Sequence, residues 1–322
     1  MASPNWTDIM TTTIVNRQKK LADNVSNNNA LLKRLESKGK IKPADGGTKI
    51  AQELEYGENG TFLWYSGYDN LTITPSEVLS AAEFDWKQCA VAVTMSGLEE
   101  LQNSGVERMI DLMDARISNA EKTMKNKMAA AVYGDGTAAA GKAIGGLGLI
   151  VADSGTGQVG NIDAATWTFW KNQTFDATTD GTAAATAANI LAYMNRMWLK
   201  LCRGTDKPDL LVADDAYYTL YWSALLPNQR FTSPAMAQAG FESLKYMSAD
   251  VVFDGGMGGA CPLNHMYFLN TDYIYLRPHT DRQYVPLNPD RYMNNQDAVW
   301  KLIGWAGNMT TSGRKFQGVL KD

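Results

Sequence analysis

The feature that most constrains the fold of this chain is a long run of apolar residues with helical spacing between residues 106 and 132. Apolar side chains recur there at steps of three and four residues, which places them on one side of an α-helix. The stripe comprises Val106, Met109, Ile110, Met113, Ile117, Ala120, Met124, Met128 and Val132. Such a helix is roughly 40 Å long at 1.5 Å per residue, well above the usual ~11–12 residues. A rod with one narrow apolar stripe predicts a spine against which a sheet packs.

Short polar motifs indicate where this helical region begins and ends. The segments Ser96–Glu99 and Ser104–Glu107 both have the spacing of a capping box, in which serine and glutamate satisfy each other's backbone amides. A Gly-Asp-Gly sequence at residues 134–136 follows the stripe and is a helix-termination signal. We therefore predict helical structure over residues 96–133.

The preceding region, residues 55–95, has the composition of β-structure. A Ser66-Gly67 pair lies between aromatic and β-branched runs, a pattern that predicts a β-hairpin. Four aromatic residues gather near its tip, within residues 59–70: they are Phe62, Trp64, Tyr65 and Tyr68. Exposed aromatic patches mark protein interfaces. We therefore expect these four side chains to contact another subunit.

Residues 84–95 alternate in polarity as a half-buried strand does. One face carries Cys89, Val91, Val93 and Met95. The sequence predicts that this apolar face is buried.

The first 54 residues are polar and have little apolar surface of their own. Leucine and valine spacing predicts a weakly amphipathic helix around residues 14–37, which Pro43 and two glycines would end. Basic residues begin with Arg17, Lys19 and Lys20 and continue through Lys42, while the rest of the chain is correspondingly acidic. We interpret this segment as an arm that docks on the acidic body of a neighbouring copy. Contact with nucleic acid is the alternative, although no aromatic residues are interleaved with the charges.

Residues 137–322 have a mixed α/β pattern. Helices are predicted near residues 185–202 and 217–225, the second capped by Asp214. Short buried strands are predicted at DLLVADD and ADVVFDGG, and two more on either side of Thr271-Asp272. The last 25 residues indicate a closing hairpin that turns at Gly307-Asn308.

Residues with catalytic or metal-binding chemistry are few. The chain has three widely separated cysteines and two histidines, His265 and His279, both at predicted strand ends. No metal-binding spacing and no nucleophile motif accompanies them. The segment Gly136–Lys142 matches most of a phosphate-binding loop. However, Ala143 stands where a Ser or Thr should bind Mg²⁺, and a helix precedes the loop instead of a strand. We expect no catalytic, cofactor-binding or metal site.

Charge and hydrophobicity exclude two further classes. The formal net charge of −4 is unlike the basic excess of a typical nucleic-acid binder. No apolar run approaches the roughly 20 residues of a membrane-spanning helix, and the first 20 residues lack a signal-peptide core. We therefore expect no membrane partner, and a cytosolic protein before it assembles.

Read in order, the arm, hairpin, long helix and mixed α/β remainder resemble the major capsid proteins of tailed bacteriophages, the family with the Hong Kong 97-type fold. The local sequence supports the resemblance over residues 95–322. The segments that carry it are GVERMIDLMDARISNAEKTMKNKMAAAVYGDGT, IGGLGLIVAD, KPDLLVADDAYYTLY, YMSADVVFDGG, NHMYFLNTDYIYLRPH and DAVWKLIGWAGNMTTS. Each block is only moderately specific, and their joint order carries the resemblance.

The resemblance implies an α+β fold with a definite organisation. Residues 1–54 would be an N-terminal arm, and 55–95 an extended β-hairpin loop followed by a strand of the peripheral domain. Residues 96–149 would be the peripheral domain with its spine helix, 150–290 approximately the axial domain, and 291–322 the strands that return to the peripheral domain.

The resemblance also implies a structural role without catalysis. Pentamers and hexamers of such a subunit form the icosahedral head around double-stranded DNA, which is contacted without specificity. Expected partners are further copies, a separate scaffolding protein (the chain leaves no room for one before its arm), a portal and a decoration protein. Alternatives are another virion structural protein, an encapsulin-type compartment and, remotely, a nucleotide-binding enzyme that uses Gly136–Lys142.

Overall fold

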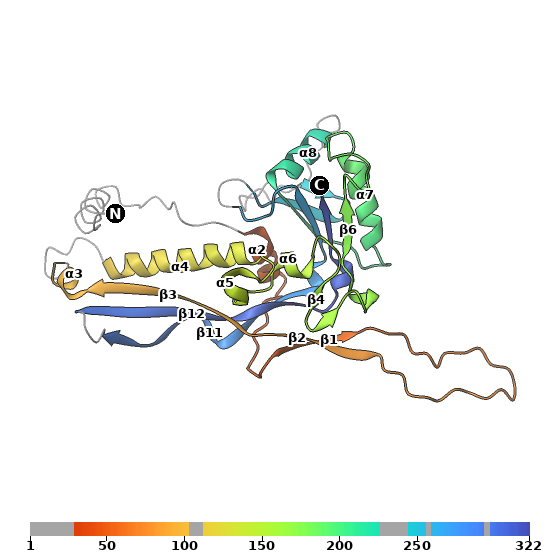
Figure 1. The fold of residues 1–322 in the computed structure, drawn as a ribbon, viewed down its shortest axis with the longest axis horizontal. Coiled ribbons are helices and arrows are strands. Elements are labelled where there is room, and N and C mark those ends of the chain that lie inside the picture. Colours follow the sequence, from red (N-terminus) through yellow and green to blue (C-terminus); the bar gives the residue numbers. More distant parts are fainter. Residues whose placement is uncertain (1–28, 103–111, 226–243, 256–258, 293–296) are drawn as a thin grey trace.

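The computed structural model describes residues 29–102, 112–225, 244–255, 259–292 and 297–322. These residues form an elongated molecule with two main sheets and two small two-stranded sheets, a long helix beside one main sheet, and a loop that projects from the body (Figure 1). The fold is mixed α and β, as the sequence predicts.

One end of the molecule is a three-stranded antiparallel sheet backed by the long helix. Its order is β11 (Ile274–Tyr292), β12 (Ala298–Thr311) and β3 (Lys87–Ser96), and helix α4 (Leu112–Ala131) lies along it (Figure 1). The predicted stripe faces the core: Ala120, Met124, Met128 and Val132 are buried there together with Val93 and Ile303. The spine helix is therefore confirmed over residues 112–131, and its predicted first turns lie outside the described residues.

The capping box at Ser96 is present. The Glu99 carboxylate accepts the Ser96 amide at 3.2 Å, and the Ser96 hydroxyl accepts the Glu99 amide at 3.3 Å. Together they begin the short helix α3 (Gly97–Gln102). The second predicted box, Ser104–Glu107, lies outside the described residues.

A six-stranded sheet forms the second half of the body. Its strand order is β6 (Gln173–Asp176), β13 (Gly318–Lys321), β10 (His265–Leu269), β7 (Leu210–Ala213), β9 (Ala249–Phe253) and β8 (Leu244–Tyr246). Both faces are buried. Leu210 and Val212 face the spine-helix core, whereas Leu211 and Ala213 face helices α7 (Ile190–Leu201) and α8 (Asp215–Leu225). This explains why strand β7, in the middle of the sheet, is a continuous apolar run and not an alternating one.

Several shorter elements connect these two parts. They are α2 (Ala30–Ser37), β1 (Ile50–Glu55), β2 (Leu79–Phe84), α5 (Ala138–Gly141), α6 (Leu147–Ile150), β4 (Gln158–Val159), β5 (Ile162–Asp163), η1 (Thr168–Trp170), η3 (Thr271–Tyr273) and η4 (Arg314–Phe316). Asp214 caps α8 as predicted, because its carboxylate accepts the Tyr217 amide at 2.9 Å.

The predicted turn at Gly307-Asn308 is wrong. Strand β12 continues through both residues, and Gly307 pairs with Pro278 on one side and Lys87 on the other. A side chain at Gly307 would collide with the backbone of Arg277, so glycine is required here for close strand approach. The buried Asn308 side chain accepts the Gly145 amide and donates to the Asp85 carbonyl. The chain turns later, and β13 enters the other sheet.

Two further expectations about strands differ from the structure. The segment after Thr271-Asp272 is one 19-residue strand, β11, and not a short one, so His279 lies inside a strand while His265 begins β10. On β3, Val93 is buried and Val91 and Met95 are half-buried as predicted, but Cys89 is exposed.

A buried arginine in η4 binds the backbone of the segment between α6 and β4. Arg314 is fully buried, and its guanidinium donates to the carbonyls of Ile150 and Thr156 at 2.8 Å and of Gly157 at 3.1 Å. Burial lowers the pKa of Arg314 to about 10, so the group stays charged at neutral pH.

We expect Arg314→Met to destabilise the subunit by about 3–5 kcal/mol, because it leaves buried carbonyls without donors. Lys315→Met is the matched control, since Lys315 is exposed and should change stability by less than about 0.5 kcal/mol. Urea unfolding of both variants measures the difference. Equal midpoints would show that the carbonyls find other donors.

Candidate assembly surfaces

The loop between β1 and β2, residues 56–78, projects from the body (Figure 1). The predicted hairpin exists, but its strands are Ile50–Glu55 and Leu79–Phe84, paired from Ile50↔Phe84 to Glu55↔Leu79. The aromatic and β-branched runs that suggested strands are not paired in the described structure. Pairing occurs instead where the two strands pack on the body.

The base of the loop is fixed by a separate core. Residues Ile50, Leu54, Ala82 and Phe84 pack with Val159 and Trp170. The Trp170 indole donates to the Val159 carbonyl at 2.9 Å, and the Glu83 amide donates to the Gly160 carbonyl at 3.0 Å. Gly160 has a φ of +60°, and a Cβ there would lie 2.7 Å from that of Ala82. The two strands are therefore held in place even though the loop beyond them lacks a sheet.

The loop itself is shaped by side-chain hydrogen bonds. Near its base the Asn59 side-chain oxygen accepts from the Thr61 amide at 3.0 Å and from the Ser76 hydroxyl at 3.1 Å, which ties its two arms together. At its tip the Asp69 carboxylate accepts the Ser66 amide at 2.8 Å, and Gly67 has a φ of +52°. The turn predicted at Ser66-Gly67 is confirmed.

The four predicted aromatic residues are exposed on this loop. The exposed fractions are 74% for Phe62, 90% for Trp64, 65% for Tyr65 and 106% for Tyr68. The aliphatic residues Leu71 and Ile73 are also exposed on this loop, outside the aromatic cluster that the sequence shows. The burial of such side chains on association is worth about 25 cal/mol per Å² of apolar area. A loop with this surface is suited to contact another molecule.

The N-terminal segment contacts the body of its own chain. Helix α2 buries Leu31 and Leu35 in the spine-helix core. Beyond it, residues 41–44 run beside β11, with the Lys42 amide donating to the Leu276 carbonyl at 3.0 Å. The helix starts at Ala30, capped by Asn29; any earlier part of the predicted 14–37 helix, together with Arg17, Lys19 and Lys20, lies outside the described residues.

Basic residues of α2 and the turn after it pair with acidic residues distant in sequence. Arg34 bridges Asp209 at 3.4 Å and Asp250 at 3.3 Å, while Lys38 pairs with Asp209 at 3.0 Å. In the described part of the arm these basic side chains pair with carboxylates of the same chain, and contact of the arm with a neighbouring copy stays a prediction. Sequence order cannot show which copy supplies the acids.

The segment that resembles a phosphate-binding loop does not have the required geometry. Gly136–Lys142 follows the long helix α4, and α5 within it is a single exposed turn. Ala139 and Ala140 adopt left-handed backbone angles, so the amides do not form the start of a regular helix that could bind phosphate. The structure gives the nucleotide alternative no support.

Two pairs of titratable groups in the described part of the chain have structural roles. The buried Tyr133 hydroxyl donates to Asp254, whose pKa is raised by burial. His265 pairs with Asp153 at 3.1 Å. Burial lowers the pKa of His265, but the hydrogen bonds with Asp153 and with the Leu263 carbonyl, together with the charge of Asp153, outweigh burial, so the net shift of this pKa is upward.

The described residues contain neither a metal-binding cluster nor a membrane-spanning helix. Among those that the structure describes, no group of three or more His, Cys, Asp or Glu side chains is arranged to hold a metal ion. None of the described helices combines the length and apolar content needed to cross a bilayer.

Comparison with known proteins finds similarity in structure and not in sequence. No protein-family model and no curated protein matches the chain. Among solved structures, the capsid asymmetric unit of cyanophage A-1(L) matches with a TM-score of 0.65 and 17% identity, over 94% of this chain and 96% of that one. The Gordonia phage Cozz protein matches with a TM-score of 0.59 and 11% identity, over 94% and 89%.

An encapsulin has the same architecture. The SrpI encapsulin of Synechococcus elongatus matches with a TM-score of 0.52 and 8% identity, over 96% of this chain and 94% of that one. At these identities the likeness concerns the fold. The projecting loop, spine helix and two main sheets of this chain have the arrangement of the Hong Kong 97-type fold of phage capsid proteins.

Proposed function

We propose that this chain is the major capsid protein of a tailed bacteriophage, a non-enzymatic subunit that assembles into the shell of the virion. One observation carries the proposal: the fold of this chain aligns with that of a cyanophage capsid chain over 94% of its length. If only part of the chain matched, the shared part could be one domain of a protein with a different function.

The shape of the molecule supports a role in assembly. A subunit that tiles a surface uses contacts between copies where an enzyme uses a pocket. Such heterologous contacts form closed rings when the rotation between copies closes. We propose that pentameric and hexameric rings of this chain build an icosahedral head around double-stranded DNA, after assembly in the host cytoplasm with a scaffolding protein, a portal and a decoration protein.

The parts of the chain would divide this work. We propose that residues 1–54 act as an arm, and that 55–95 contribute the extended loop, which reaches a neighbouring copy through Phe62, Trp64, Tyr65 and Tyr68. The peripheral domain would comprise 96–149 with the returning strands of 291–322, and the axial domain approximately 150–290. Strand β13 is an exception within this division, because it pairs with β6 and β10 in the six-stranded sheet.

A second candidate is the shell of an encapsulin-type compartment, favoured by the full-length match to SrpI. The two functions differ in what the shell encloses. Negative-stain microscopy of the purified protein, alone and with co-expressed scaffold, should show closed shells. Particles from the native source should contain nuclease-protected DNA for the phage function, or a co-purifying enzyme for the encapsulin. A compact monomer under all these conditions would contradict both.

A further inference from the structure

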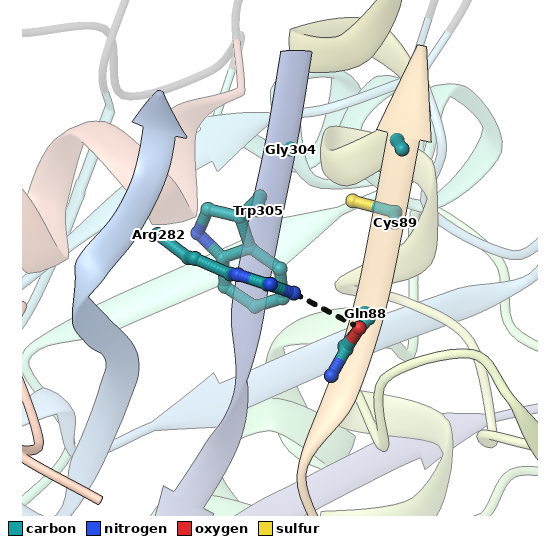
Figure 2. A pocket seen from close by; sticks show the side chains of 6 residues that line it. Gln88, Cys89, Arg282, Gly304 and Trp305 are labelled. Atoms are coloured by element: carbon teal, nitrogen blue, oxygen red, sulfur yellow. Dashed lines mark hydrogen bonds between the residues drawn. The ribbon is translucent and has the colours of Figure 1, made fainter. Parts of the chain in front are cut away.

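The three-stranded sheet has a notch on its exposed surface. Strand β11 bulges between Pro278 and Gln283, where the register slips against β12, and again at Tyr284, which has a φ of +57°. The bulges open a cavity of about 150 Å³. Figure 2 shows the side chains around it; the lining residues are Gln88, Cys89, Ala90, Arg282, Gly304 and Trp305.

Arg282 gives the notch a positive charge. Its guanidinium reaches across β12 and donates weakly to the Gln88 side-chain oxygen at 3.4 Å (Figure 2). Among the described residues, no carboxylate lies within ion-pair distance of Arg282, including that of its neighbour Asp281. The cavity can accept an aromatic ring against its apolar floor. Arg282 is exposed and has a single weak acceptor, so it can pair with a carboxylate beside that ring.

The projecting loop offers the complementary chemistry. Residues 56–78 contain Glu58, Asp69 and Glu77 and no basic residue. At the tip, the fully exposed Tyr68 is followed by Asp69. One carboxylate oxygen of Asp69 accepts the Ser66 amide, and the other can pair with a cation. A cavity near 150 Å³ holds one six-membered ring, so a tyrosine ring fits.

The projecting loop extends away from the strands β3 and β12 that carry the notch of its own copy. In Figure 1 the loop leaves the body on the side away from the course of β3 and β12. A loop that fills the notch must therefore come from another copy, which is a head-to-tail contact of the kind that forms rings.

We propose that Tyr68 of one copy inserts into the notch of the next, with Asp69 paired to Arg282. The inference rests on the proposed shell function and assigns its loop contact to named residues on both sides. The ring displaces water from the apolar floor, and the ion pair orients the tip of the loop.

A native thiol in the notch provides a direct test. In a Cys202→Ser background, Tyr68→Cys places a thiol where Cys89 of the next copy can reach it. Diamide takes two electrons and two protons from the thiol pair, which becomes a disulfide while the azo bond is reduced to a hydrazine. Burial raises the pKa of Cys89, so oxidation is run at mildly alkaline pH to form the thiolate. Assembled shells should give a ladder of linked chains on non-reducing gels, and Cys89→Ser should abolish it.

Charge reversal gives the second test. Arg282→Glu should raise the protein concentration needed for assembly about tenfold, equivalent to about 1.4 kcal/mol, and adding Asp69→Arg should restore most of it. Arg196→Glu, an exposed change on α7, should assemble like wild type.

Wild-type shells with no ladder and no effect of Arg282→Glu would overturn the docking site and leave the shell function standing. An equal defect from Arg196→Glu would also overturn it. Failure of the wild type to assemble would overturn both.

Discussion

Replacement of Met124 by aspartate is expected to prevent the subunit from folding. Met124 is 2% exposed and lies where α4, the three-stranded sheet and the inner face of the six-stranded sheet share one core. An unpaired carboxylate there loses its hydration and has no counter-ion. The cost of about 3–5 kcal/mol, added to the lost packing of methionine, is comparable with the total stability of a domain, about 5–15 kcal/mol.

Lys125 provides the control because it is the next residue along the same helix and is exposed. Lys125→Asp makes the same new side chain and should change the free energy of unfolding by only about 0.5 kcal/mol. The two variants are compared by soluble yield, far-UV circular dichroism and thermal melting, which show whether each of them folds. A soluble Met124→Asp protein that melts cooperatively near the wild-type temperature would contradict the spine assignment.

The elements predicted correctly are those whose pattern is local. The spine helix follows from one apolar stripe, and the caps at Ser96 and Asp214 from side chains within three residues of the amides that they accept. Strands β7 and β9 are continuous apolar runs because both faces of their sheet are buried. In each case the physical cause lies within the segment, so the sequence contains it.

The errors concern residues whose role is set by distant partners. Gly307 looks like a turn residue, but it is glycine because two neighbouring strands approach it closely. The aromatic and β-branched runs within residues 56–78 have the composition of strands. The paired strands β1 and β2 form nearer the body instead, because their apolar side chains pack with Val159 and Trp170. The partners of Arg34 are likewise not visible in the sequence, because the carboxylates of Asp209 and Asp250 lie 175 or more residues away.

The candidate assembly surface was predictable on one side only. A cluster of aromatic residues around a turn is visible in the sequence, and the structure places all four on the exposed loop. The notch cannot be recognised in the sequence, because it arises from bulges in β11 that bring Arg282 over residues of β12 and β3. Bulges depend on the register between strands, which no local pattern in this segment gives.

Deletion of residues 59–70 is expected to leave a folded subunit that makes no stable shells. The deleted segment is exposed, whereas β1, β2 and the core that fixes them remain. Stability to unfolding should therefore change little, because removal of a surface loop shortens a chain segment that contributes little packing. Assembly should fail, since the variant lacks the aromatic surface that is proposed to contact the next copy.

Two further variants separate the loop's surface from its length. Replacing Phe62, Trp64, Tyr65 and Tyr68 by serine keeps the backbone and should abolish shells as the deletion does. Replacing Thr72 and Thr74, which are exposed polar residues of the same loop, by serine should leave assembly normal. Shells are counted by microscopy and by sedimentation, with circular dichroism to verify folding. If the deletion variant formed normal particles, the stability of the shell would have to come from other contacts, and the loop would be no more than a surface extension of the fold.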